Sequence, residues 1–208
     1  MAARAPHLSR RAAAKAARRR ALIDATIRCI AAKGLGGTTL ADVAKQAGLS
    51  QGIVNLHFRT KDNLLKETLE FLAAEYDERF MQTLADTPDD PLAKLEALMA
   101  MDLSPALCER RKLAVWFAFW GEVKFVPTYQ KICAERDRKY DGIVHDLVQQ
   151  VIDEGGYRDV DARAVSDSLT SMTDGFWLSC LVDPKRFDRD AAQRAVDRFL
   201  RATFPASH

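Results

Sequence analysis

The chain has 208 residues, a formal net charge of +2 and 48% hydrophobic residues, which is enough for one or two domains with a buried core. The charge is uneven, because residues 1–65 hold 12 basic and 3 acidic side chains whereas the remaining residues hold 19 and 26. A basic first third on an acidic body is typical of a nucleic-acid-binding module joined to a domain with another role. A uniformly basic chain would instead indicate nonspecific coating of nucleic acid.

Several classes of protein are disfavoured by what the sequence lacks. There is no apolar signal segment and no apolar run long enough for a membrane span. The histidines are scattered, and no glycine-rich phosphate loop follows a strand. The four cysteines are too far apart for a zinc or redox motif. Cys29, Cys133 and Cys180 lie within apolar helical patterns and are predicted to be small buried side chains, and Cys108 has no partner nearby in sequence that would indicate a nucleophile. We therefore expect a cytoplasmic protein that is not an enzyme, binds no metal or cofactor and does not act at a membrane.

The first predicted elements are a basic arm and a helix. Residues 1–17 are rich in Ala and Arg and predict a loose basic N-terminal arm that can become helical toward its end. Residues 18–33 predict a helix that Gly34 ends, with an inward face made by Leu22, Ala25, Thr26, Cys29 and Ile30.

Residues 39–58 carry the most specific pattern of the chain. Thr39 and Asp42 are spaced as a capping box at the start of a helix, and Leu40, Val43, Ala44 and Ala47 form one apolar stripe. Gly48 can end that helix in the left-handed conformation, and Ser50 is placed to cap a second helix over residues 51–58. Two helices joined by such a turn predict a helix-turn-helix, whose second helix enters the DNA major groove. An ordinary helical hairpin is the alternative, which the basic charge disfavours.

The remaining chain is predicted to be helical throughout. Thr60 caps a helix over 61–84, the stretch 86–91 is a break, and further helices are expected at 92–102, 105–124, 127–154, 161–181 and 188–203. No segment alternates with period two, so the predicted class is all-α with about nine helices. The predicted domains are the arm at 1–17, a DNA-binding domain at 18–65, and a second helical domain at 66–208.

The second helix of the motif is predicted to read DNA with the face opposite Val54 and Phe58, which point inward. The amides of Gln51 and Asn55 suit adenine or phosphate, and Gly52 permits close approach of the backbone to DNA. The apolar side chains of Ile53 and Leu56 can contact thymine methyl groups or the protein's own surface. His57 and Lys61 are placed for phosphates, and Arg10, Arg11 and Arg18–Arg20 for the DNA backbone or minor groove, although solubility explains these arginines nearly as well. The predicted DNA-binding residues are Thr39, Gln51, Gly52, Ile53, Asn55, Leu56, His57 and Lys61.

A homodimer is expected, because one helix-turn-helix gains little specificity from half a site. Two predicted helices have apolar faces that could pair across a two-fold axis, or serve the core of one chain. These faces comprise Tyr140, Ile143, Val144, Leu147, Val148, Val151 and Ile152 in the first helix, and Val165, Leu169, Met172, Phe176 and Cys180 in the second.

The N-terminal pattern resembles the TetR family of bacterial repressors. The resemblance covers about residues 18–65 and is carried by the segments 18–26, 38–44, 47–52 and 57–62. It implies a three-helix DNA-binding domain, an all-helical ligand-binding and dimerisation domain, and release from an operator when a small effector binds. Asn55 departs from the family, which usually has Tyr there, and can contact either a phosphate or a base.

Two later segments resemble the BetI branch, the choline-responsive repressors of glycine betaine synthesis genes: Trp-Phe-Ala-Phe-Trp at 116–120 and Asp-Gly-Phe-Trp-Leu at 174–178. Aromatic faces and a nearby carboxylate are how proteins hold a quaternary ammonium. The predicted effector-binding residues are Trp116, Trp120, Glu122, Tyr129, Asp174 and Trp177, with Tyr140 a further candidate. Alternatives are that the rings are core anchors, that the effector is aromatic or lipophilic, or that the protein is architectural and has no effector.

Overall fold

The computed structural model of the chain describes residues 10–205, which form nine helices and no strand. This confirms the predicted all-α class. The chain divides into two compact units between Phe71 and Leu72, within the fourth helix.

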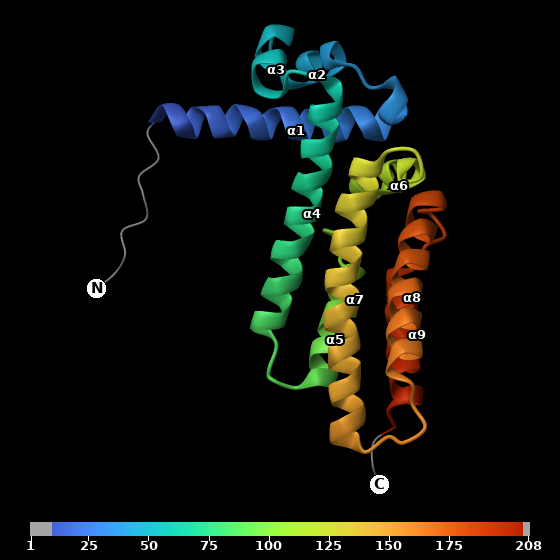
Figure 1. The fold of residues 1–208 in the computed structure, drawn as a ribbon. Coiled ribbons are helices and arrows are strands. Elements are labelled where there is room, and N and C mark those ends of the chain that lie inside the picture. Colours follow the sequence, from blue (N-terminus) through green and yellow to red (C-terminus); the bar gives the residue numbers. More distant parts are fainter. Residues whose placement is uncertain (1–9, 206–208) are drawn as a thin grey trace, which may run out of the picture. The chain divides into compact units, whose positions relative to one another are not determined.

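The first unit contains α1 (Arg10–Gly37), α2 (Leu40–Ala47), α3 (Gln51–Phe58) and the start of α4 (Lys61–Asp86) (Figure 1). Residues 10–17, which we expected in a basic arm, are helical, in keeping with the high helix propensity of their alanines. The rest of the predicted arm, residues 1–9, lies outside the described residues. Gly34 (φ 72°) interrupts the helical dihedral angles of α1 at the predicted end of the first helix.

The core of the first unit lies between α1, α2, α3 and the first turns of α4. The whole predicted inward face of α1 is buried, as are Val43 and Ala44 of α2. The largest fully buried side chains are Leu22, Ile23, Phe58, Leu64 and Leu69. Burial of these apolar side chains provides the main driving force for the fold of the unit.

The second unit contains the rest of α4 and five further helices, of which α7 and α8 lie side by side (Figure 1). These helices are α5 (Pro91–Asp102), α6 (Arg110–Glu122), α7 (Pro127–Gly155), α8 (Ala162–Val182) and α9 (Arg189–Thr203). The helix predicted from residue 105 begins only at Arg110, because residues 103–108 form turns in which the Ser104 carbonyl accepts from the backbone N–H of Cys108 (2.9 Å). No helix within residues 10–205 has the length and apolar character needed to cross a membrane.

Most apolar residues that were candidates for a dimer interface lie in the core of the single chain. Buried members are Tyr140, Val144, Leu147, Val148, Val151 and Ile152 of α7, and Val165, Leu169 and Cys180 of α8. The alternative interpretation, in which these faces serve the chain's own core, therefore describes most of them. Large apolar side chains exposed on α8 are instead Leu178 and Val182.

Candidate DNA-binding surface and effector site

The start of α2 has the predicted capping box. The Thr39 hydroxyl accepts from the backbone N–H of Asp42 (3.1 Å), and the Asp42 carboxylate accepts from the backbone N–H of Thr39 (3.2 Å). Gly48 ends α2 in the left-handed region (φ 67°), as its place in the sequence predicted. Ser50 occupies the N-cap position of α3, but its side chain makes no capping hydrogen bond.

Helix α3 has one buried face and one exposed face. Val54 and Phe58 are both 0% exposed and fix the helix against the core of the first unit. The opposite face carries Gln51, Gly52 and Asn55, all exposed, and Leu56, which is 80% exposed. Ile53 and His57 are partly buried at its edges, and Thr39 is exposed at the start of α2. An exposed helix face with amide and apolar side chains has the chemistry for reading base edges.

Cationic groups surround this face. The pKa of His57 is lowered by partial burial and then by the nearby charges of Lys15, Arg18 and Arg19, so its imidazole is mostly neutral at pH 7. Lys61, predicted for phosphate contact, donates to the carbonyl of Gly36 (3.1 Å). The Lys61 ammonium therefore has an internal partner that a phosphate would have to share or replace.

Two arginines predicted for the DNA backbone make contacts within the first unit. The Arg19 guanidinium pairs with Glu67 and lies 5.6 Å from the ring centroid of Phe58. The Arg20 guanidinium lies 4.0 Å from the ring centroid of Phe71 and pairs with Asp24 (3.0 Å). These contacts hold the side chains of Arg19 and Arg20 against the first unit. The side chains of Arg10 and Arg11 lie outside the described part.

The second unit brings the three tryptophans together. Trp120 lies next to Trp116 (ring centroids 6.3 Å apart) and stacks on Trp177 (6.4 Å, interplanar angle 16°). Trp177 also packs edge-on against Tyr76 of α4 (6.1 Å) and donates its indole N–H to the carbonyl of Asp102 (2.8 Å). Tyr140 of α7 packs edge-on against Tyr76 (4.8 Å), so α4, α6, α7 and α8 all contribute rings to one aromatic cluster.

A cation already lies within this cluster. The Arg136 guanidinium carbon is 4.7 Å from the ring centroid of Trp116, 5.1 Å from that of Tyr76 and 5.6 Å from that of Trp120. All three distances are within the range of a cation–π interaction. We call Tyr76, Trp116 and Trp120 the aromatic cage. Its geometry is suited to surrounding a positive charge with aromatic faces.

Carboxylates gather beside the cage. Asp102 is buried, accepts from the Tyr76 hydroxyl (2.8 Å) and has its pKa raised to about 7 by burial, against the opposing effects of that hydrogen bond and of Arg136. Asp174 has its pKa raised to about 6 by partial withdrawal from water, with Arg136 again opposing the shift. Both groups need a nearby positive charge to ionise readily, and a cationic ligand would supply one.

A cavity of about 160 Å³ opens between these groups. Among the described residues that line it are one cationic side chain, Arg136, and four carboxylates, those of Asp102, Asp137, Asp141 and Asp174. Tyr76, Tyr140 and Trp177 supply the aromatic part of its wall. The cavity is smaller than the ~300–1,000 Å³ of typical ligand pockets. It suits a small cation better than a bulky lipophilic molecule.

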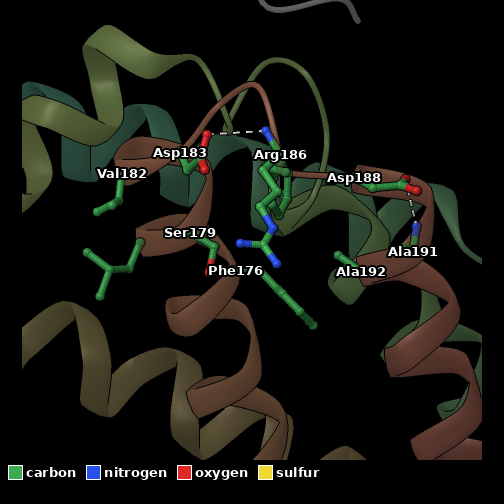
Figure 2. A pocket seen from close by; sticks show the side chains of 10 residues that line it. Phe176, Ser179, Val182, Asp183, Arg186, Asp188, Ala191 and Ala192 are labelled. Atoms are coloured by element: carbon green, nitrogen blue, oxygen red, sulfur yellow. Dashed lines mark hydrogen bonds between the residues drawn. The ribbon is translucent and has the colours of Figure 1, made fainter.

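Of the six predicted effector residues, Asp174 and Trp177 line the cavity, whereas Trp116 and Trp120 lie in the adjoining aromatic cluster without lining it. The other two lie elsewhere. Glu122 is exposed in the last turn of α6, and Tyr129 is buried edge-on against Phe119 (4.9 Å); neither lines the cavity. A larger hollow of about 650 Å³ lies on another face, between α8, the α8–α9 connection and α9 (Figure 2). Its wall includes exposed Leu178 and Val182 and has no aromatic cage, so its chemistry is that of a contact surface.

Sequence reasoning missed Arg136 and Asp102, although a signal for each was present. Arg136 lies three residues after buried Cys133 and four before buried Tyr140. Asp102 lies four residues after buried Leu98. A charged residue in register with an apolar helical stripe is placed toward the core and requires a partner there.

Known families match both units of the chain. The family described as "Bacterial regulatory proteins, tetR family" matches residues 22–68, and "BetI-type transcriptional repressor, C-terminal" matches residues 91–205. The HTH-type transcriptional regulator BetI of Burkholderia thailandensis is 30% identical over 184 residues, which cover 88% of this chain and 91% of that protein. The BetI regulator of Paraburkholderia xenovorans matches with the same identity and coverage.

Solved structures share the fold at lower identity. A transcriptional regulator from Pseudomonas aeruginosa PAO1 superposes with a TM-score of 0.80 at 24% identity and covers 90% of each chain. One from Saccharomonospora viridis, in complex with choline, has a TM-score of 0.80 at 22% identity and covers 89% of this chain and 96% of that one. These neighbours support the fold. From its two family matches and its relatives, the chain belongs to the TetR family of bacterial regulators and is a transcriptional repressor with a BetI-type C-terminal domain, not an enzyme.

Proposed function

We propose that this repressor binds its operator through α3 and releases it when a small quaternary ammonium compound, with choline the first candidate, enters the cavity beside the aromatic cage. The observation that carries the proposal is that the cage already surrounds a cation, the Arg136 guanidinium, with three aromatic faces. The surplus of carboxylates around the cavity gives it a negative charge that attracts a second cation.

Choline fits the chemistry of this cavity. A quaternary ammonium has no N–H donor, so aromatic faces and carboxylates can bind it without a specific acceptor geometry. The S. viridis neighbour was solved with choline, and the relatives at 30% identity are named BetI, which supports the same ligand class here. Control of glycine betaine synthesis genes is the corresponding physiological proposal. A purely lipophilic effector is less compatible with the charged wall of the cavity.

On the DNA side, we infer a division of roles along the exposed face of α3. Gln51 and Asn55 offer amides for base edges or phosphates, and Leu56 offers apolar contact for a thymine methyl group. Gly52 allows close approach, and Ile53 borders the face. Thr39, His57 and Lys61 flank it and are suited to phosphate contacts that set the register on DNA without reading sequence.

Helix α4 offers a continuous route between the two activities. It begins at Lys61, one of the proposed phosphate contacts, and further along carries Tyr76, a wall of the cage. A ligand that moves Tyr76 therefore acts on the same helix that bears Lys61. For release, the ligand must bind the DNA-incompetent state more tightly, because equal affinity for both states shifts nothing.

We further propose that the repressor acts as a homodimer through the outer faces of α8 and α9. Leu178 is 47% and Val182 is 71% exposed there, beside the hollow whose lining side chains are drawn in Figure 2. Acidic Asp183 and Asp188 and basic Arg186 occur on the same surface, so a two-fold related copy can match opposite charges. A dimer would present two α3 helices to two half-sites.

Operator release tests the proposed function. Operator selected from random DNA is bound to the protein, and its release is followed by fluorescence anisotropy with choline, glycine betaine, carnitine or betaine aldehyde. The neutral control is 3,3-dimethylbutanol, which replaces the choline nitrogen by carbon. We expect release by at least one quaternary ammonium and none by the neutral analogue. No release by any of these cations would refute the effector proposal.

The cage residues can be tested in the same assay. Trp120→Leu removes the aromatic face while retaining apolar bulk, and should weaken the choline response with little change in operator affinity. Phe125→Leu is the matched control, because Phe125 is 72% exposed and its ring is not among the three that surround the Arg136 guanidinium. Trp177→Leu is a less specific variant, since it would also leave the carbonyl of Asp102 without its indole donor.

A further inference from the structure

We propose that Arg136 is a built-in competitor for the effector: its guanidinium occupies the cation position of the aromatic cage, and a ligand cation must displace it to bind. The inference rests on the proposed function in that the effector is a cation. Beyond the proposed function, it assigns to Arg136 a role in setting the affinity and selectivity for the effector.

The position of Arg136 relative to the cage carries the proposal. Its guanidinium carbon lies within 5.6 Å of the ring centroids of Tyr76, Trp116 and Trp120, which come from α4 and α6, while Arg136 itself comes from α7. Its side chain is 11% exposed. A ligand cation seeking the same aromatic faces therefore meets an occupied position.

The cage satisfies this guanidinium incompletely. Asp137, the next residue in the chain, accepts from its Nε (2.9 Å) and forms an ion pair with Nη2 (2.9 Å), but Nη1 is buried with no hydrogen-bond partner within the described residues. Aromatic faces attract the charge of a guanidinium without supplying acceptors in the plane where its N–H groups point. A quaternary ammonium leaves no N–H group unsatisfied in the same position, and so it is better matched to the cage.

The displaced guanidinium has carboxylates to move toward. Asp141 and Asp174 line the same cavity as Asp137, and Asp174 retains surface exposed to water. The charge of Arg136 can therefore stay near a carboxylate when its place among the rings is taken. This exchange costs less than removing an isolated buried charge from its partners.

The test measures binding of a probe cation, tetramethylammonium, to the full chain without DNA. Calorimetry and tryptophan fluorescence compare the wild type with Arg136→Ala, which empties the cage, and with Arg138→Ala, an exposed arginine two residues along α7. We expect Kd for tetramethylammonium to fall at least tenfold in Arg136→Ala and to stay unchanged in Arg138→Ala. Methylguanidinium should also bind Arg136→Ala, since it restores the lost group. The affinity of neutral neopentyl alcohol should increase much less on this substitution than the affinity of either cation.

Each other outcome overturns the proposal. Weaker or unchanged binding of tetramethylammonium to Arg136→Ala would mean that Arg136 does not compete with it. An equal increase in affinity for neopentyl alcohol would mean that the substitution only created space. If Arg136→Ala does not fold, Arg136→Gln replaces it with the same expectations. In the wild type, the Nε–H resonance of Arg136 should lose its ring-current shift on saturation with tetramethylammonium; an unmoved resonance with bound probe also refutes displacement. Failure of operator release concerns the proposed function alone, because these measurements contain no DNA.

Discussion

Replacing Asp102 by Asn should change how the stability of the protein depends on pH. Asp102 lies at the end of α5, fully surrounded by protein, and its carboxylate accepts from the Tyr76 hydroxyl (2.8 Å). Burial raises the pKa of this group to about 7 from the 3.8 of an exposed aspartate. Asn keeps the shape and an oxygen acceptor for Tyr76 but does not titrate.

The sign and size of the effect follow from linkage between protonation and folding. Because the folded state retains the proton to higher pH than the unfolded state, the stabilisation is complete below about pH 4 and is lost as pH rises through about 7. Each pKa unit corresponds to about 1.4 kcal/mol, so raising pH from 5 to 8 should reduce the contribution of Asp102 by about 3 kcal/mol. The asparagine of the Asp102→Asn variant cannot make this contribution at any pH, because its amide does not titrate.

The assay is urea denaturation at pH 5 and pH 8, at one fixed protein concentration. The difference in unfolding free energy between wild type and Asp102→Asn should shift by about 3 kcal/mol in favour of the variant at pH 8. A constant cost of the unpaired Asn amide cancels in this comparison. Glu96→Gln, which neutralises an exposed carboxylate on the same helix, is the control and should show no comparable shift. A difference between wild type and Asp102→Asn that is independent of pH would refute the reasoning.

Three further outcomes are expected. Thr39→Ala should lower the free energy of unfolding by about 0.5–2 kcal/mol through loss of its capping hydrogen bond, whereas Thr39→Ser should lose much less; equal losses in thermal melts would contradict this. Gln51→Ala should relax base preference at about 1–3 kcal/mol per lost contact, while Lys61→Ala should weaken binding to all DNA and flatten its salt dependence; titrations on operator and scrambled DNA distinguish the two. The double variant Leu178→Lys with Val182→Lys should sediment as a monomer, and an unchanged dimer would exclude this face.

The DNA-binding unit was largely predictable because its signals are local. The capping box at Thr39 and Asp42 and the left-handed Gly48 depend on residues close in sequence, and the inward face of α1 follows from helical periodicity. Ser50 shows the limit of this reasoning. Serine is only statistically preferred at the N-cap, and no second residue supports the assignment as Asp42 supports Thr39. The Ser50 side chain makes no capping hydrogen bond in α3.

The effector site was predictable only in part because it is assembled from distant segments. Sequence reasoning chose Trp116, Trp120 and Trp177 by their chemistry, and they meet in one cluster. The position of Tyr76 beside Trp177 depends on the packing of α4 against the other helices, which no local pattern specifies. Glu122, a further predicted member of the site, lies at the exposed end of α6.

The resident guanidinium also bears on the choice between effector classes. A neutral lipophilic molecule entering the cage would remove Arg136 from three aromatic faces without supplying any charge to the carboxylates around it. A cation replaces the interaction that it disrupts and adds a positive charge near Asp102 and Asp174, whose pKa values are raised by burial and lowered by nearby positive charge. Binding of a cation should therefore favour the ionised forms of both groups and release protons near neutral pH. Because the ligand has to replace the positive charge of Arg136 in an acidic cavity, a quaternary ammonium should bind better than an aromatic hydrocarbon.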